Sequence, residues 1–441
     1  MAIFNSANGS YQDFNKTLFE AMMLASTNGV AISNSNPLPV ISGLGDAFGR
    51  SRVSNPLTLF DSFHRFADNG KFNTSNTATG TATFIANTAS VDMTIDGTNG
   101  AYVYRESKKT FAYQPGKSLQ ILNTFVMNPA ATGLRQRVGY FSSNNGIFLE
   151  RSANTASGIS MVKRSYVSGS VVDTHVDQSA WNVDKLDGSG PTRLTLNLDD
   201  PQILFIDMEW LGVGSVRTGF VINGTLVPCH MFHHSNLNAA PKGAYMQTAC
   251  LPIRYEIENT SAGSGGTLKQ ICSTVISEGG YNIQGKPRSI GTDVQSTNAV
   301  QCSAAGTFYP IVSLRLHANA LDGIVVPKQV GVLPISATNY RWKLVTGATI
   351  AGAVWANTSS DSIVQYNTNA TATMSGGTDV NMGFISSTVQ GGGSITITDG
   401  IFQYQLERNT FTSAATTFTL AVAAAAATSN VAGSITWEEV T

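Results

Sequence analysis

Two acidic residues two positions apart, Asp207 and Glu209, are the strongest candidates for chemistry in this sequence. In an extended strand, positions 205, 207 and 209 share one face at steps of about 6.6 Å. Two carboxyl groups on one face can hydrolyse a glycosidic bond, one as nucleophile or base and the other as acid. The residue that completes this row is Phe205, and a phenyl ring cannot form a covalent glycosyl intermediate.

The segment from Ile206 to Gly212 resembles the active-site strand of the jelly-roll β-glucanases, whose motif runs Glu-x-Asp-x-Glu or Glu-x-Asp-x-x-Glu. By this resemblance, Phe205 stands at the nucleophile position, Asp207 at the orienting position and Glu209 at the acid/base position. The missing first carboxylate favours a jelly-roll strand without hydrolysis, so we expect no catalytic residue and no enzyme. Asp207 and Glu209 then face solvent or pair with Arg217 on the next strand, and both remain candidates for ligand binding.

One cysteine and three histidines stand close together in the sequence, at Cys229, His230, His233 and His234. On a strand, Cys229 and His233 share one face and His230 and His234 the other, with the members of each pair about 13 Å apart. Zinc ligands must all lie within about 2.3 Å of one ion. We therefore expect a cluster at a strand end and no metal, although a turn after His230 would bring the donors together.

The loop from Trp181 to Pro191 contains Asp184 and Asp187, whose oxygens suit Ca²⁺ together with a backbone carbonyl. Asp-Gly and Gly-Pro are also common in ordinary turns, where an aspartate caps its own loop. We expect the turn, and calcium binding stays an open alternative. The sequence contains no glycine-rich phosphate loop before a helix and no recognisable Ser or Cys nucleophile motif, so we expect no cofactor.

Three aromatic residues near the C-terminus, Trp342, Trp355 and Tyr366, are candidates for binding a host glycan. An exposed aromatic ring can stack on the apolar face of a sugar. The same residue types also fill hydrophobic cores. Both interpretations stay open at this point.

Charged residues make up only 12% of the 441 positions, and the net charge is −1. An ordinary soluble domain has about 25%. Nucleic-acid binding and membrane attachment through a basic patch are therefore not expected, since both need clustered Lys and Arg.

The sequence has no apolar run long enough to span a bilayer, and its first residues lack the features of an export signal, so we expect synthesis and folding in the cytosol. Four cysteines without a CxxC spacing are expected to be reduced.

The hydrophobic pattern predicts one helix followed by many strands. Ser10 and Asp13 form a weak capping box before a helical period that ends at Gly29. Alternation predicts half-buried strands over 91–95 and 194–198. Asn-Gly and Asp-Gly dipeptides predict hairpins over 216–232 and 394–407. This succession indicates an all-β protein of packed antiparallel sheets.

We expect three parts: an N-terminal helix with an extended docking arm (1–60), a central jelly-roll, concanavalin-like β-sandwich (61–330) and a second, C-terminal β-sandwich (335–441). The boundary is placed between Gly323 and Ser336, where Pro327 and Pro334 bracket a short apolar linker. Residues 344–406 contain three charges, all acidic. We expect this part to bury uncharged polar surface against copies of itself or against a neutral ligand.

Several segments in order along the chain resemble a family of virion structural proteins of tailed bacteriophages, many of them from marine and cyanobacterial hosts. The resemblance runs from residue 46 to the C-terminus and is carried by Asp46–Pro56, Leu59–Ser62, Tyr113–Lys117, Arg137–Phe141, Asn145–Glu150, Trp181–Pro191, Trp210–Gly214, Gly219–Gly224, Leu251–Glu256, Ile276–Tyr281, Leu406–Asn409 and Trp437–Glu439. It implies a particle component without known catalytic residues. Its position on the head, tail or fibre stays open.

Three functions follow from these observations. The first is a non-enzymatic structural component of a tailed-phage virion, a tail, fibre or capsid-decorating appendage that is assembled in the host cytoplasm, forms a homo-oligomer and docks on other virion proteins through its N-terminal region. The second is a module of the virion that binds a host glycan or receptor. The third is a degenerate jelly-roll β-glucanase.

Overall fold

The structure is a computed structural model that describes residues 3–5, 10–12, 55–153, 158–237, 242–282, 284–295, 299–369, 371–387, 393–396 and 404–440. The chain divides into two units, Met1–Val53 and Ser54–Thr441. In the first unit, β1 (Ile3–Asn5) pairs with β2 (Ser10–Gln12) in an antiparallel hairpin. Ser10 therefore lies in a strand opposite Asn5 and does not cap a helix. The rest of the predicted helix, 13–29, and most of the predicted arm lie outside the described residues.

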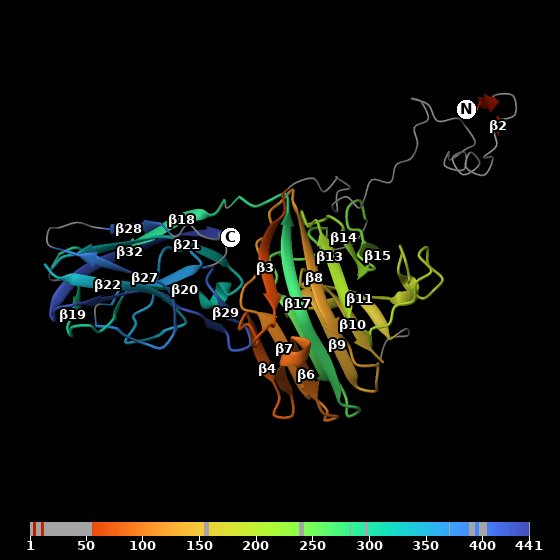
Figure 1. The fold of residues 1–441 in the computed structure, drawn as a ribbon, viewed down its shortest axis with the longest axis horizontal. Coiled ribbons are helices and arrows are strands. Elements are labelled where there is room, and N and C mark those ends of the chain that lie inside the picture. The colour runs from red at the N-terminus through yellow and green to blue at the C-terminus, as the bar shows by residue number, and fades with distance from the viewer. Residues whose placement is uncertain are drawn as a thin grey trace. The chain divides into compact units, whose positions relative to one another are not determined.

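All described elements are β-strands or 3-10 helices of three residues, so the all-β prediction is confirmed. The described part of the chain contains no helix that is long and apolar enough to cross a membrane. Every pair of described strands is antiparallel, as expected for packed antiparallel sheets (Figure 1). The concanavalin-like jelly-roll winding of the central part stays a prediction.

The central sandwich consists of two sheets. The seven-stranded sheet has the order β12 (Val172–Asp177), β11 (Ile159–Ser165), β10 (Gly146–Ser152), β9 (Leu134–Phe141), β16 (Ile253–Asn259), β7 (Tyr102–Ser107) and β4 (Phe72–Asn76). The eight-stranded sheet has the order β15 (Thr225–Phe232), β14 (Val216–Ile222), β13 (Gln202–Met208), β8 (Ser118–Val126), β17 (Gly266–Glu278), β6 (Ser90–Ile95) and β5 (Thr81–Ile85), and β3 (Leu57–Phe63) also pairs with β17.

Apolar alternation places one hydrophobic core between these two sheets. In β6, Val91, Met93 and Ile95 are buried while Thr94 is exposed, as predicted. Side chains from both sheets join one buried cluster, among them Tyr140 and Ile257 from one sheet and Ile121, Leu204 and Phe220 from the other. Period-two burial thus fixes which face of each strand is available to a ligand.

Two local predictions had different outcomes. The hairpin over 216–232 is confirmed, because β14 and β15 flank Asn223 and Gly224, whose φ angles of 52° and 76° fit a type I′ turn. The strand predicted over 194–198 is wrong, since this segment makes one isolated bridge, between Thr195 and Asp187. Its leucines still pack on the core. The alternating pattern therefore predicted correctly which side chains are buried, although no neighbouring strand pairs with this segment.

The second sandwich also contains two main sheets. One has the order β18 (Lys286–Gly291), β32 (Ser429–Val440), β21 (Ile324–Pro334) and β28 (Gly393–Thr396), with β19 (Val300–Cys302) paired to β32. The other has the order β24 (Ala356–Asn357), β25 (Val364–Asn367), β20 (Tyr309–Leu316), β31 (Phe418–Ala424), β22 (Asn339–Thr346) and β27 (Thr378–Ser386). Two small hairpins complete it, β23 (Thr349–Ala351) with β26 (Thr373–Ser375) and β29 (Arg408–Asn409) with β30 (Ala414–Ala415).

Strand pairing differs from the expected division of the chain. The expected linker around Pro327 is strand β21, which pairs with β32 along its length. The prolines are accommodated because the register shifts between Pro327 and Gln329 and because Pro334 ends the strand. Strands β18, β19 and β20 also pair with C-terminal strands, so residues from 286 onward contribute to the second sandwich. The Asp399-Gly400 turn lies outside the described residues, and β28 pairs with β21.

A buried arginine, Arg408, connects β29 to strand β7 of the central sandwich. Its side chain forms salt bridges of 2.9 Å to Glu106 and 3.1 Å to Asp322 and donates a hydrogen bond to the carbonyl of Ser107. The Arg408 carbonyl in turn accepts a hydrogen bond of 2.8 Å from Asn73. These contacts are made within the unit Ser54–Thr441 and tie its two sandwiches together.

Candidate functional site

The structure places the glucanase-like pair Asp207 and Glu209 in the interior. Asp207 lies near the end of β13 and Glu209 directly after it, and each side chain is 1% exposed. The neighbouring Phe205 is also buried. A substrate in solution cannot reach either carboxylate, so the predicted alternative in which they face solvent is wrong.

Asp207 pairs with Arg217 on the adjacent strand, as one of the two predicted alternatives states. The register of β13 and β14 sets these residues directly opposite each other, and their side chains form a salt bridge. Arg217 is itself buried. This pair is a cross-strand charge pair of the kind that stabilises a sheet.

Glu209 has a different partner. Its Oε1 accepts a hydrogen bond of 2.6 Å from the hydroxyl of Tyr113, and that hydroxyl accepts one of 3.2 Å from the backbone N–H of Leu211. Trp210 packs edge-on against the Tyr113 ring. Glu209 and Asp207 are therefore each held in the interior by a neighbouring side chain.

The glycan candidates of the second sandwich do not form one aromatic surface. Trp342 is 5% exposed and belongs to the core of this sandwich. Tyr366 lies on β25, three strands away from Trp342 on β22, and packs partly against the same core. Trp355 is half-buried under the guanidinium of Arg315, at 4.2 Å from the ring centroid. Trp342 is therefore a core residue, one of the two roles that the sequence left open.

Of the two candidate metal sites, the loop of Asp184 and Asp187 has a structural explanation. Asp184 accepts backbone hydrogen bonds from Leu186 at 2.9 Å and Thr192 at 2.8 Å, and Asp187 accepts one from Ser189 at 2.8 Å. These contacts are those of aspartates that cap their own turns, as predicted. In the described part of the chain, no group of three or more His, Cys, Asp or Glu side chains could hold a metal ion.

Many of the chain's few charged residues lie on the outer face of the seven-stranded sheet. Salt bridges connect arginines to carboxylates there, most of them between neighbouring strands, and Arg137 and Arg164 also lie over the ring of Phe148. The pairs are Arg135–Glu258, Arg137–Glu150, Arg137–Glu256, Arg164–Asp173, Arg254–Glu106 and Arg254–Glu256. Together with Arg408, which pairs with Glu106 and Asp322, five arginines face six carboxylates, so the charges here largely offset one another.

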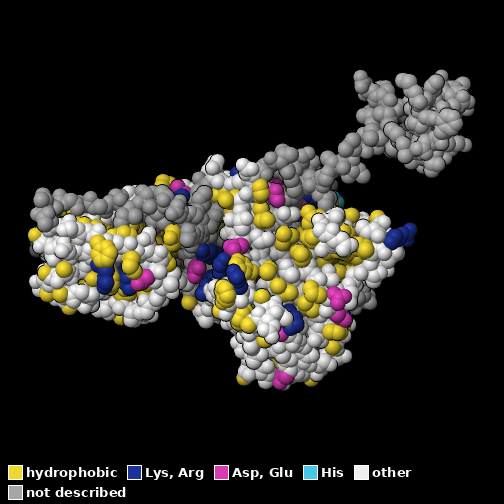
Figure 2. All heavy atoms as spheres, viewed as in Figure 1, with side chains coloured by type: hydrophobic (Ala, Val, Ile, Leu, Met, Phe, Trp, Pro, Cys, Tyr) yellow, Lys and Arg dark blue, Asp and Glu magenta, His cyan; other side chains and the backbone are white. Residues whose placement is uncertain are grey.

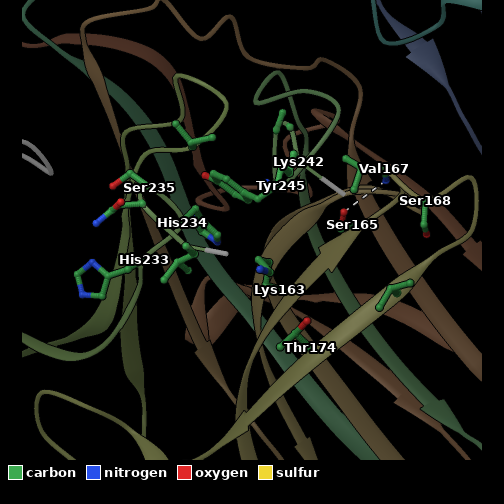
Figure 3. A pocket seen from close by; sticks show the side chains of 16 residues that line it. Lys163, Ser165, Val167, Ser168, Thr174, His233, His234, Ser235, Lys242 and Tyr245 are labelled. Carbon is green, nitrogen blue, oxygen red and sulfur yellow. Dashed lines mark hydrogen bonds between the residues drawn. The ribbon is translucent and has the colours of Figure 1, made fainter. Parts of the chain in front are cut away.

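A pocket of about 690 Å³ opens at the edge of the central sandwich (Figure 3). One wall consists of β11, edge strand β12 and the turn between them, and the other of the segments after β13 and β15 together with residues 242–245. Ligand pockets in proteins typically enclose about 300 to 1,000 Å³. The size and position of this pocket make it the best candidate site in the described part of the chain.

The first wall continues the core-facing side of β11. Ile159 and Met161 pack on the core, and the next two positions on the same face are Lys163 and Ser165. Thr174 on β12 lies directly opposite Lys163 in the register. The intersheet space thus changes from apolar to polar where the pocket begins.

The second wall contains a stacked pair of rings. His234 and Tyr245 stack with centroids 3.6 Å apart and an interplanar angle of 7°. The His234 Nδ1 lies 2.7 Å from the carbonyl of Gly214. The ammonium of Lys163 lies 5.9 Å from the centre of the Tyr245 ring, and Figure 3 shows Lys163 in the space between this ring pair and Thr174.

Burial sets the protonation of this wall. Burial, together with the positive charge of Lys163 and the neighbouring His233, lowers the pKa of His234 to about 4 despite its hydrogen bond to the Gly214 carbonyl, so the imidazole is neutral at pH 7. Burial raises the pKa of Tyr245 well above its usual value, and the neighbouring Tyr113 and Glu209 act in the same direction. Glu209 thus lies behind the pocket wall, near Tyr245.

The pocket includes two histidines of the candidate metal cluster. His233 and His234 line it, and they are joined there by Lys163 and Tyr245, which belong to no sequence motif. A signal for Lys163 was present: a lysine follows two apolar residues at the core-facing positions of one strand. Tyr245 comes from an irregular segment without a period, so no sequence pattern indicates it.

No protein-family model and no curated protein matches this sequence. Among solved structures, the carbohydrate recognition domain of Emp47p matches with 10% identity and a TM-score of 0.33, over 51% of this chain and 97% of that chain. A legume lectin-like domain from Entamoeba histolytica matches with 10% identity and a TM-score of 0.29, over 50% of this chain and 97% of that chain. The CBM2 module of the evolved Dit of Lactobacillus casei BL23 phage J-1 matches with 8% identity and a TM-score of 0.33, over 52% and 98%.

Each of these matches covers about half of this chain with a TM-score below 0.5, so neither fold nor function is transferred from them. The resemblance to virion proteins stays a prediction.

Proposed function

We propose that this protein is a non-enzymatic structural component of a tailed-phage virion, assembled in the host cytoplasm, that binds a saccharide through the pocket of its central sandwich. The virion role is supported by the motifs between residue 46 and the C-terminus. It is also supported by the face of the molecule in Figure 2, where charged side chains are few among hydrophobic side chains and other uncharged atoms. Such a surface suits contacts with copies of itself and with other virion proteins, because burying an ion that is imperfectly paired is costly.

The non-enzymatic assignment rests on the two carboxylates that resemble a glucanase pair. Asp207 pairs with Arg217 and Glu209 with Tyr113, and both are buried. A retaining glycosidase needs two accessible carboxyl groups about 5 to 5.5 Å apart. The described lining of the pocket contains no Asp or Glu, which also supports binding without turnover.

The observation that carries saccharide binding is the composition of the pocket. Its lining alternates hydroxyl side chains, such as Ser165 and Thr174, with apolar ones, such as Val172 and Val213. Sugars present hydroxyl groups at their edges and apolar C–H groups on their faces, and a wall of this mixed kind matches both. The pocket also lies at an open edge of the sandwich, where a chain of sugars can enter and leave.

Two experiments test the proposal. Purified particles imaged with an antibody against this chain should be labelled, and the isolated chain should sediment as a homo-oligomer; an unlabelled particle together with a monodisperse monomer would refute the structural role. For the binding role, a glycan array probed with the full chain should give signals that Thr174→Trp abolishes, since the indole would fill the pocket beside Lys163. Thr267→Trp, on β17 outside the pocket, is the matched control.

A further inference from the structure

We infer that the pocket selects anionic saccharides, with Lys163 as the residue that recognises the acidic group. This inference rests on the saccharide-binding role proposed above and names the class of sugar. The basis is the charge of the pocket, the position of Lys163 in the fold and the contrast between Lys163 and the buried arginines of the same sandwich.

The charged side chains in the described lining of the pocket are all positive. Its described lining includes two lysines, Lys163 and Lys242, and no carboxylate. The chain as a whole has 27 basic and 28 acidic residues, so the excess of positive charge is a local property of the pocket. An anion in the pocket would meet two positive charges and no repulsion from the lining.

Lys163 occupies a position that the fold would otherwise give to an apolar residue. It continues the core-facing row of Ile159 and Met161, and its partner across β10 is the fully buried Ile147. Burial consequently lowers the pKa of its ammonium. Lys163 is half-buried, and an opposite charge nearby would offset its partial desolvation.

The buried arginines of this sandwich have such partners and Lys163 does not. Arg105 lies 2.8 Å from Asp68, and Arg254 lies 2.8 Å from Glu106. Among the described residues, Lys163 forms no salt bridge or side-chain hydrogen bond, and its contact is with the ring of Tyr245. The opposite charge is therefore expected from a ligand.

The groups around Lys163 fit the remainder of a sugar acid. Thr174 lies across from Lys163, and Ser165 follows on the same face of β11. Their hydroxyls can donate to and accept from ring hydroxyls next to the acidic group. Recognition of an anion beside several hydroxyls describes a uronic acid or a sulfated sugar.

Titration calorimetry on the full chain with two matched pairs of probes tests this inference. The carboxylate pair is tetragalacturonate and its methyl ester, and the sulfate pair is a sulfated galactotetraose and the unsulfated galactotetraose. We expect the charged member of at least one pair to bind and its neutral partner to bind at least about tenfold more weakly, since a hydrogen bond to a charged group contributes roughly 1.5 to 3 kcal/mol. The probe pair in which the charged member binds more tightly shows whether the pocket prefers a carboxylate or a sulfate.

Three variants test whether Lys163 is the residue that binds the acidic group. Lys163→Met should weaken binding of the charged probe about tenfold or more, while Lys163→Arg, which keeps the charge, should retain most of it. Lys286→Met, an exposed lysine of β18, is the matched control and should leave binding unchanged. Thermal unfolding of each variant checks that it is folded.

The outcomes separate this inference from the proposed function. Equal binding of charged and neutral probes, or charged-probe binding that Lys163→Met leaves intact, would overturn the inference and leave saccharide binding in place. A chain that binds none of the four probes and is silent on the glycan array would overturn both.

Discussion

The hydroxyl of Tyr113 donates a hydrogen bond of 2.6 Å to the carboxylate of Glu209, and both side chains are buried. Tyr113 comes from the segment before β8, whereas Glu209 follows β13, so the contact connects two parts of the chain that are 96 positions apart. A carboxylate held in this way supports the packing around it. Its resemblance to the acid of a glucanase concerns the sequence alone.

Removing this contact should change stability and not catalysis. We expect Tyr113→Phe to lower the free energy of unfolding by about 1 to 3 kcal/mol, because the buried carboxylate loses a donor. The measurement is urea denaturation. In a reducing-sugar assay on laminarin, the wild type and Glu209→Gln should both remain at background; turnover that Glu209→Gln abolishes would contradict the non-enzymatic assignment.

The pair of Asp207 and Arg217 should behave as a buried salt bridge. Arg217→Met leaves the Asp207 carboxylate buried without its cross-strand cation, so we expect a loss of about 3 to 5 kcal/mol. The double variant Asp207→Leu with Arg217→Met should regain most of this loss, since an apolar pair needs no compensation for desolvation. Equal instability of the single and double variants in denaturant titrations would count against this explanation.

The two tryptophans proposed from sequence as glycan ligands should differ sharply in their effect on stability. Trp342→Ala should cost about 3 to 5 kcal/mol, because it empties a core position. Trp355→Ala removes a contact with Arg315 at the surface of the sheet and should cost about 1 kcal/mol. Neither variant that remains folded should change saccharide binding, and a loss of binding with Trp355→Ala would restore the second sandwich as a binding site.

Arg408 should be important for the attachment of the two sandwiches to each other. Its replacement by Met removes the salt bridges to the buried Glu106 and the half-exposed Asp322, and we expect a loss of about 3 to 5 kcal/mol because the Glu106 carboxylate remains buried. Lys286→Met, which breaks an exposed pair with Asp361, should change stability by less than about 1 kcal/mol. Thermal melts of both variants make the comparison, and similar melting temperatures would refute the role of Arg408.

Stability should fall as the pH is lowered from about 6.5 to about 4. His234 has an ordinary pKa of 6.5 that burial lowers to about 4 in the folded protein, and His230 behaves alike. Between these values the unfolded chain binds protons that the folded chain does not, so acid favours unfolding. Urea titrations at pH 7, 5.5 and 4.5 should show this slope, and His234→Gln should reduce it. An unchanged slope in this variant would assign the effect to other groups.

Local patterns predicted some strands of the central sandwich and missed others. The Asn223-Gly224 turn was placed correctly because a type I′ turn demands positive φ at two successive residues and few dipeptides accept it. The prediction over 194–198 failed because alternation reports which side chains are buried and does not report whether a partner strand is present. The linker predicted at Pro327 failed because a register shift lets a proline sit within a strand.

The sequence by itself determined that the protein is all-β, that its strands pair antiparallel and that charge is scarce. These properties follow from periodicity, turn residues and composition, all of which are local. Tertiary structure alone decided that Asp207 and Glu209 are buried, that Trp342 fills a core and that Lys163 faces a pocket beside Tyr245. The physical reason is that burial and charge pairing depend on which strands become neighbours, and β-sheets bring together residues that are far apart in the chain.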